Sequence, residues 1–260
     1  MSAGIPGAGS PAPASLPPRF LDWDACLNVR DFGGLPAQDG RRIRPGALVR
    51  SETTALLTSY GVQAALDYGI RTVIDLRFPQ ELDLTPSPFA SLSPSVQYLN
   101  LPLDTDQDLL WPGPPTPAEA MRDLYCRLLE TNHHWVTSTL RAMTLARPGG
   151  VLFNCHAGKD RTGVIAAVVL ALLGAPDGEI AADYAVTYPR LEQRRLDLIA
   201  EPGRTPDDRA FLEVITSALP ETMRLTLGYL RRQYGGVEGY LRAAGFTPEE
   251  QESLRDRLLE

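Results

Sequence analysis

The chain has 260 residues, of which 43% are hydrophobic and 22% charged, enough for one sizeable domain with its own core. Its net charge of -7 argues against nucleic acid or an anionic membrane as a non-specific partner. The three cysteines, Cys26, Cys126 and Cys155, have neither the even number nor the spacing of a disulfide framework or a zinc site. A reducing, cytoplasmic compartment is therefore expected.

The first 18 residues are rich in Ala, Gly, Ser and Pro, a composition that cannot bury enough apolar surface to become ordered. They lack the basic start and compact apolar run of a secretory signal, so export would need a signal of another kind. We predict a disordered tail over residues 1–18 and a single domain over residues 19–260.

Short β-rich runs have helical stretches between and after them. The predicted strands cover residues 47–50, 72–76, 96–101 and 151–155. A long irregular connection is expected over residues 105–117, and amphipathic helices are expected in the last third. One of these helices should begin at Thr247-Pro248, because Thr is a good cap and Pro suits the first helical position. The alternation predicts an α/β fold.

The segment from Arg161 to Leu173 is apolar on nearly every side. Its β-branched residues would also suit a strand, but its length and the stop signal of Gly174 favour a helix. Because it lacks a polar stripe, this helix should be buried.

The strongest chemical signal lies between that helix and the strand before it, where the sequence reads Cys155-x5-Arg161. A loop that enters a helix directs free backbone N–H groups and the positive end of the helix dipole toward one point, which suits a phosphate. Gly158 allows a tight bend, and Arg161 can grip two phosphate oxygens. The same positive field favours the thiolate of Cys155, the nucleophilic form of a cysteine.

This arrangement predicts that Cys155 attacks phosphorus and that water then hydrolyses a cysteinyl-phosphate, with no metal or cofactor. The other residues expected to bind phosphate or substrate are His156, Ala157, Gly158, Lys159, Thr162 and Gly163. Thr162 could also hydrogen-bond the sulfur and ease its departure. The general acid is expected to be Asp160 in the loop, with Asp104 after the third strand as the second candidate.

The loop resembles that of the bacterial members of the protein-tyrosine-phosphatase superfamily, which reads H-C-x-A-G-K-D-R-T-G. Further similar elements are N-x-R-D-x-G-G at 28–34, R-S-x at 50–52, D-L-R-x-x-x-E at 75–81 and G-G-x-x-x-Y-L at 235–241. The resemblance covers the chain from about Leu21 to its end. It implies a central, mostly parallel sheet of about four to five strands flanked by helices. It also implies activity on phosphotyrosine, with phosphoserine, phosphothreonine or phosphoinositides as further substrates.

The sequence departs from this family at Asn154, where the family usually has His. An uncharged Asn should support the thiolate less well. Asn154 also keeps open an alternative, a weak or inactive pseudophosphatase that only binds phosphorylated partners. A rhodanese-type sulfurtransferase, another enzyme with a Cys before a helix, is disfavoured by its shorter loop and by the Arg161-Thr162-Gly163 ending here.

Several other residues invite a functional reading. The segment 183–195 could form a lid over the loop, with Tyr188, Arg190, Arg194 and Arg195 available to contact an anionic substrate, or could be an ordinary surface helix. Glu81 could partly neutralise Lys159 if the two meet.

Asn28, Arg30 and Asp31 should brace the Gly33-Gly34 turn and support the loop. The pair at 133–134 is expected to bind no metal because adjacent side chains point apart.

Overall fold

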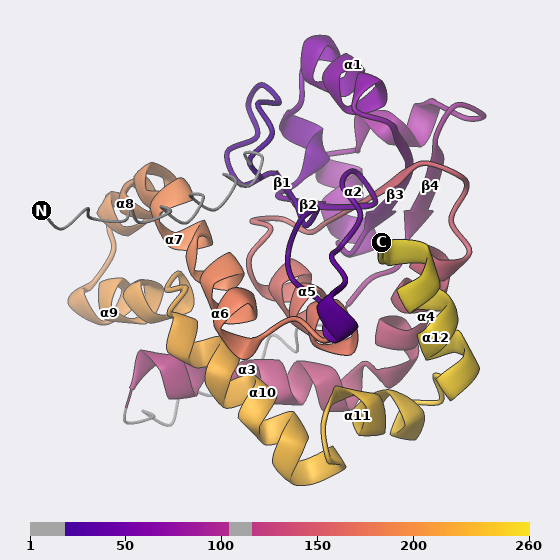
Figure 1. The fold of residues 1–260 in the computed structure, drawn as a ribbon. Coiled ribbons are helices and arrows are strands. Elements are labelled where there is room, and N and C mark those ends of the chain that lie inside the picture. The colour runs from indigo at the N-terminus through magenta and orange to yellow at the C-terminus, as the bar shows by residue number, and fades with distance from the viewer. Residues whose placement is uncertain (1–18, 104–115) are drawn as a thin grey trace, which may run out of the picture.

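A single five-stranded sheet organises the chain in the computed structural model, which describes residues 19–103 and 116–260 (Figure 1). The strand order is β1-β2-β5-β3-β4. Only β1 is antiparallel to its neighbour; the other pairs are parallel. The strands are β1 Arg30–Asp31, β2 Leu48–Ser51, β3 Ile70–Asp75, β4 Gln97–Asn100 and β5 Gly150–Asn154. The predicted α/β fold with a mostly parallel sheet is confirmed.

Twelve α-helices surround the sheet in the described parts of the chain. Those of the first two thirds are α1 Ser59–Asp67, α2 Pro79–Leu84, α3 Pro117–Thr131, α4 His133–Thr144, α5 Asp160–Leu172 and α6 Asp177–Ala185. The remainder are α7 Thr187–Arg190, α8 Glu192–Ala200, α9 Pro206–Ile215, α10 Pro220–Tyr234, α11 Val237–Ala243 and α12 Pro248–Leu258. Short 3-10 turns occur at Gln38–Gly40, Thr54–Leu56 and Pro88–Ser91.

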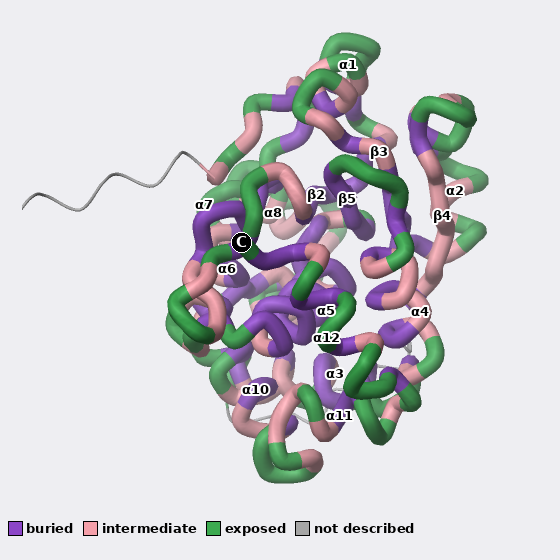
Figure 2. Tube along the Cα trace, turned by 45° about the vertical axis from the view of Figure 1, so that its right-hand side comes forward, coloured by how far each residue is buried: buried purple, intermediate pink, exposed green. Residues whose placement is uncertain are grey.

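The two faces of the sheet bury different sets of apolar residues, because successive side chains of a strand point to opposite sides. Val49, Val73 and Leu152 join a smaller core that includes Ala65 of α1. Ile74 and Phe153 join the larger core on the other face, to which α5 contributes most of its length. Figure 2 shows α5 as a buried element near the centre of the molecule, as its uniformly apolar sequence predicts.

The predicted strands and the central helix are confirmed to within two residues at each end. The predicted start at Thr247 is also confirmed, since its side chain accepts a hydrogen bond from the N–H of Glu250 and Pro248 opens α12. The two-residue strand β1 was not predicted, because it is too short to show an alternating pattern. The tail 1–18, Asp104 and nearly all of the expected connection 105–117 lie outside the described residues. No helix in the described parts is long and apolar enough to cross a membrane.

A buried carboxylate ties α6 to the sheet. Asp183 accepts a hydrogen bond of 2.9 Å from Arg30 Nε and one of 2.7 Å from Arg50 Nη1, and Arg19 Nη2 lies 2.5 Å away. Burial alone would raise the pKa of Asp183, but the charges of the three arginines outweigh burial and hold that pKa well below its ordinary value. Asp183 is therefore ionised across the neutral and moderately acidic range.

We expect Asp183→Asn to lower the free energy of unfolding by about 3–5 kcal/mol at neutral pH, because it leaves buried arginines without their counter-ion. The wild-type contribution is complete above the unfolded-state aspartate pKa of about 3.9 and is lost as pH falls through the lower folded-state pKa. Urea unfolding of both proteins over the acidic range should show this pH dependence in the wild type and its loss in the variant.

Asp177→Asn is the matched control, because the ion pair of Asp177 with Arg231 is about half exposed. It should cost less than about 1 kcal/mol. Equal stability losses for the two variants would contradict the role assigned to Asp183.

Candidate active site

The loop after β5 presents free backbone donors on one side and has its carbonyl groups held from the other. The carbonyl oxygens of Ala157 and Gly158 accept hydrogen bonds from Asn28 Nδ2 at 3.1 and 3.3 Å. Arg50 Nη2 donates to the same Gly158 oxygen at 2.5 Å. The N–H groups of residues 156–159 donate to no acceptor in the described parts of the chain. These N–H groups and the start of α5 are therefore available to an anion.

Gly158 is the one position in this loop where a side chain would not fit. Its φ of +65° lies in the left-handed region, and an added Cβ would lie 2.5 Å from the Ser51 carbonyl oxygen and 2.6 Å from the Glu52 nitrogen. Glycine therefore lets the loop pass directly over the end of β2.

Cys155 lies at the start of this loop, buried at the carboxyl end of β5. The register of the sheet places Ser51 and Asp75 beside Asn154, so the ends of β2 and β3 flank the residue before Cys155. Asn154 is buried, and its Nδ2 donates a long hydrogen bond of 3.4 Å to the Cys155 carbonyl oxygen. Its Oδ1 and the Thr162 hydroxyl have no hydrogen-bond partner in the described parts of the chain.

Arg161 is oriented by a two-point ion pair with Glu81. Its Nη1 and Nη2 lie 2.6 and 2.9 Å from the two Glu81 oxygens, and Nη1 also reaches the Leu76 carbonyl at 3.4 Å. Burial disfavours the charge, but Glu81 and Cys155 outweigh it and raise the pKa of Arg161 above its ordinary value. The guanidinium has five N–H donors, so the Nε–Nη2 edge remains available for two phosphate oxygens.

Glu81 is therefore occupied by Arg161 and does not neutralise Lys159. The pairing of Glu81 with Lys159 considered from the sequence is not the one that forms. Lys159 instead lies 2.7 Å from Asp160 Oδ1 and donates at 2.9 Å to the Ser217 carbonyl oxygen. Burial acts against its charge, yet Asp160 and Tyr184 raise the pKa of Lys159 above its ordinary value. The loop sequence gave no sign of this contact, because Ser217 lies far along the chain between α9 and α10.

Some of the remaining candidate residues lie on the surface of the loop, and others support it. His156 is exposed and Ala157 is half-buried. Gly163 lies under the Tyr184 ring, since a Cβ added to Gly163 would be 3.1 Å from that ring. Gly163 thus allows α6 to pack closely on α5. Asn28 and Arg30 support the loop, since Arg30 Nη1 donates to Asn28 Oδ1 at 2.6 Å and Asn28 holds the loop carbonyls.

Asp31 braces the turn that precedes β2. Its oxygens accept hydrogen bonds from the N–H groups of Gly33 and Gly46 at 3.0 and 2.7 Å, and from the Tyr68 hydroxyl at 2.8 Å. The bracing of the Gly33-Gly34 turn expected from the sequence is thus confirmed for Asp31, whereas Asn28 and Arg30 contact the loop and Asp183. Asp31 therefore serves the architecture and not the loop.

A cavity of about 740 Å³ opens beside the loop. His156, Ala157 and Lys159 contribute to its floor, while Tyr188, Leu191 and Leu198 line the wall formed by α7 and α8. The volume falls in the range of about 300–1,000 Å³ that is typical of ligand pockets. The cavity therefore pairs a loop suited to an anion with an apolar wall.

The arginines of this wall are engaged with protein groups. Arg194 Nη1 lies 2.6 Å from the fully buried carboxylate of Glu52, and Arg195 Nη1 lies 2.8 Å from Glu213. Arg190 Nε donates to the Leu27 carbonyl at 2.5 Å. Their contacts fasten α7 and α8 to the rest of the molecule and reduce the positive charge that they offer to a ligand.

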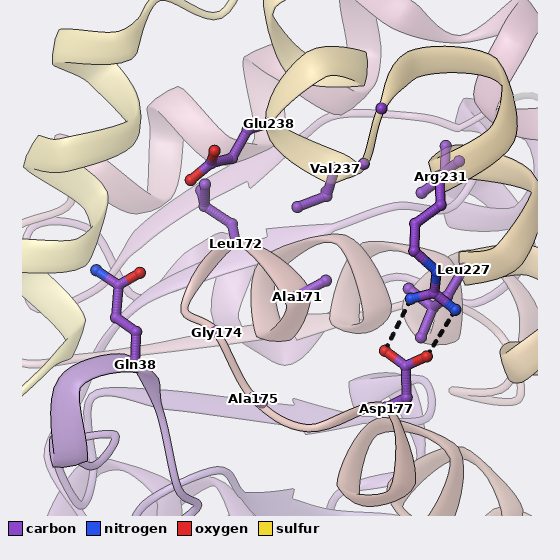
Figure 3. Close-up of a pocket in the computed structure, with 13 residues that line it drawn as sticks. Gln38, Ala171, Leu172, Gly174, Ala175, Asp177, Leu227, Arg231, Val237 and Glu238 are labelled. Carbon is purple, nitrogen blue, oxygen red and sulfur yellow. Dashed lines mark hydrogen bonds and ion pairs between the residues drawn. The ribbon is translucent and has the colours of Figure 1, made fainter.

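A second cavity, of about 350 Å³, lies at the far end of α5 and includes no residue of the loop (Figure 3). Its charged side chains Asp177 and Arg231 face each other and form an ion pair of 2.7 Å. This cavity therefore has no part in the loop chemistry.

No group of three or more His, Cys, Asp or Glu side chains that could hold a metal occurs among residues 19–103 and 116–260. His133 packs edge-on against the Tyr240 ring, with centroids 5.4 Å apart. Asp104, the second candidate acid, lies outside the described residues, so its prediction is untested.

The sequence did not point to Tyr125, Ser217 or Glu52 as parts of this site, and it placed Tyr184 only at the start of the expected lid. Tyr125 and Tyr184 have ring centroids 5.9 Å apart and lie on α3 and α6, next to Asp160. The buried Glu52 accepts hydrogen bonds from the N–H groups of Leu27 and Asn28 at 3.1 and 2.7 Å. Only Glu52 lay in a recognisable motif, the R-S-x element.

Relatives of known name match most of this chain. It is 33% identical over 245 residues, 90% of this chain and 88% of the relative, to a Cupriavidus necator protein provisionally named a tyrosine-protein phosphatase. It is 30% identical to a tyrosine-protein phosphatase of Nostoc commune, covering 86% of this chain and 78% of that protein. It is 28% identical to the triple specificity protein phosphatase PtpB of Mycobacterium tuberculosis, covering 89% of this chain and 96% of that protein.

Among solved structures, the crystal structure of P. aeruginosa TpbA in complex with phosphotyrosine aligns with a TM-score of 0.36 at 18% identity, over 72% of this chain and 88% of the other. A likeness at this level carries no argument about the site. The model of the tyrosine phosphatase family, in contrast, matches residues 21–260. With this match over nearly all of its length, the chain belongs to the tyrosine phosphatase family and is a phosphatase.

Proposed function

We propose that this phosphatase acts on phosphotyrosine in proteins, with Cys155 as nucleophile, Arg161 as phosphate-binding residue and Asp160 as general acid. The observation that carries the substrate class is the cavity beside the loop, whose wall of Tyr188, Leu191 and Leu198 suits an aromatic ring. Its volume of about 740 Å³ leaves room for residues that flank a phosphotyrosine.

In the first step, the Cys155 thiolate attacks phosphorus, the S–P bond forms and the P–O bond to the tyrosine breaks. Asp160 gives its proton to the departing oxygen, which leaves as a neutral phenol. In the second step, a water oxygen attacks the phosphoryl group while the Asp160 carboxylate takes one of its protons. The S–P bond then breaks, and phosphate and the Cys155 thiolate are released.

Phosphoinositides fit this cavity less well, although the family resemblance includes them. A headgroup with several phosphates needs several free cations, and those near the cavity have partners already. Lys159 is paired with Asp160, Arg194 with Glu52 and Arg195 with Glu213. Phosphoserine and phosphothreonine peptides can enter, but they lack the ring that the apolar wall would bury. Relative activity on these substrate classes therefore tests the proposal.

We expect kcat/KM to be highest for phosphotyrosine peptides, about tenfold or more above matched phosphoserine peptides, as burial of one aromatic ring predicts. Release of inorganic phosphate from phosphotyrosine peptides, phosphoserine peptides and soluble inositol phosphates measures this order. Cys155→Ser should remove all turnover, whereas Cys126→Ser, a change at another buried cysteine, should retain it. A preference for inositol phosphates would overturn the substrate assignment, and turnover by Cys155→Ser would overturn the mechanism.

The general acid has its own test. Asp160→Asn should lower kcat/KM, which reports only on the step that releases the leaving group, by about 10²–10⁴ for phenyl phosphate, because general acid catalysis contributes about that much. The fall in kcat/KM should be much smaller for 4-nitrophenyl phosphate, whose leaving group departs readily as an anion. A loss of kcat/KM that does not depend on the leaving group would remove Asp160 from the role of general acid.

A further inference from the structure

The two oxygens of Asp160 have different surroundings. Oδ1 accepts a hydrogen bond of 2.7 Å from the Tyr125 hydroxyl and lies 2.7 Å from Lys159 Nζ. Oδ2 has no hydrogen-bond partner in the described parts of the chain, and the Asp160 side chain is 29% exposed. One oxygen is therefore fixed by the protein, and the other is free to carry a proton.

Tyr125 is fully buried on α3, and its hydroxyl lies 2.6 Å from that of Tyr184 on α6. Tyr125 has one proton, which it gives to Asp160, so the proton between the two tyrosines must come from Tyr184. Lys159 Nζ and the Tyr184 hydroxyl both also lie near the Ser217 carbonyl oxygen, at 2.9 and 3.4 Å. A connected chain of donors thus runs from Tyr184 through Tyr125 to Asp160.

The donor character of Tyr125 does not change with pH in the range where enzymes work. Burial, followed by the charge of Asp160, raises the pKa of Tyr125 well above its ordinary value. The hydroxyl therefore keeps its proton and continues to donate to Asp160.

We propose that Tyr125 is a positioning residue for catalysis: its hydroxyl, together with Lys159, fixes Asp160 so that Oδ2 faces the departing oxygen. This inference rests on the proposed role of Asp160 and adds that catalysis also requires the hydroxyl of Tyr125, a residue outside the loop. Oδ1 accepts the Tyr125 hydrogen bond whether Oδ2 carries a proton or not. The arrangement hence serves both chemical steps without rearrangement, the preorganisation that catalysis by a fixed group requires.

Tyr125→Phe removes only the hydroxyl and keeps the ring that packs edge-on against Tyr184. We expect kcat/KM for phenyl phosphate to fall about tenfold, roughly the effect of one hydrogen bond. The kcat/KM for 4-nitrophenyl phosphate, whose departure needs no proton, should fall less than about twofold. In an Asp160→Asn background, Tyr125→Phe should have no further effect on kcat/KM for either substrate.

Tyr240→Phe is the matched control, because its buried hydroxyl also donates one hydrogen bond, of 2.8 Å, to a backbone carbonyl, that of Leu129. It should lose similar stability without changing the ratio of kcat/KM between the two substrates. If Tyr125→Phe changes that ratio no more than Tyr240→Phe does, Tyr125 is only structural and the inference is overturned. If Asp160→Asn also leaves the ratio unchanged, the failure lies in the proposed general acid and not in its positioning.

Discussion

The buried carboxylate of Asp183 organises the polar interior on which the phosphate loop depends. Arg50 contacts both Asp183 and the Gly158 carbonyl oxygen. Arg30 contacts both Asp183 and Asn28, and Asn28 holds the Ala157 and Gly158 carbonyls. Arg50 thus connects the Asp183 carboxylate to the loop carbonyls directly, and Arg30 connects it to them through Asn28. Because those carbonyls are held on that side, the N–H groups of the loop remain available on the other.

This cluster also explains how an acidic protein can favour an anion at one point. Three arginines surround one aspartate beneath the loop, which leaves an excess of positive charge in a region of low dielectric. The helix dipole of α5 adds to the same field. The net charge of -7 is therefore a poor guide to the local potential at Cys155. A stable ion cluster and affinity for phosphate arise here from the same residues.

Local sequence was sufficient to predict the loop, since Cys155, Gly158 and Arg161 act through backbone geometry and spacing within one turn. It also predicted α5, whose apolar surface on every side requires burial. It could not pair Glu81 with Arg161 or Lys159 with Asp160, because both choices depend on where α2 and the α9–α10 connection lie in space. No local motif marks Tyr125 or Tyr184 as a neighbour of Asp160. Their hydroxyl groups reach each other and Asp160 only because α3 and α6 meet beside that residue.

The arrangement of the charged groups around the cavity supports the proposed selectivity for phosphotyrosine. Arg161 uses one edge of its guanidinium for Glu81, which fixes the direction of the other edge toward the phosphate. Above the loop, Arg194 and Arg195 are paired with Glu52 and Glu213, so the wall of the cavity offers little unpaired positive charge. This distribution supports the proposed substrate, one phosphate on an aromatic ring. A substrate with several phosphates would have to break the existing ion pairs of these arginines before it could form new ones. Exchanging one partly buried ion pair for another yields little net free energy.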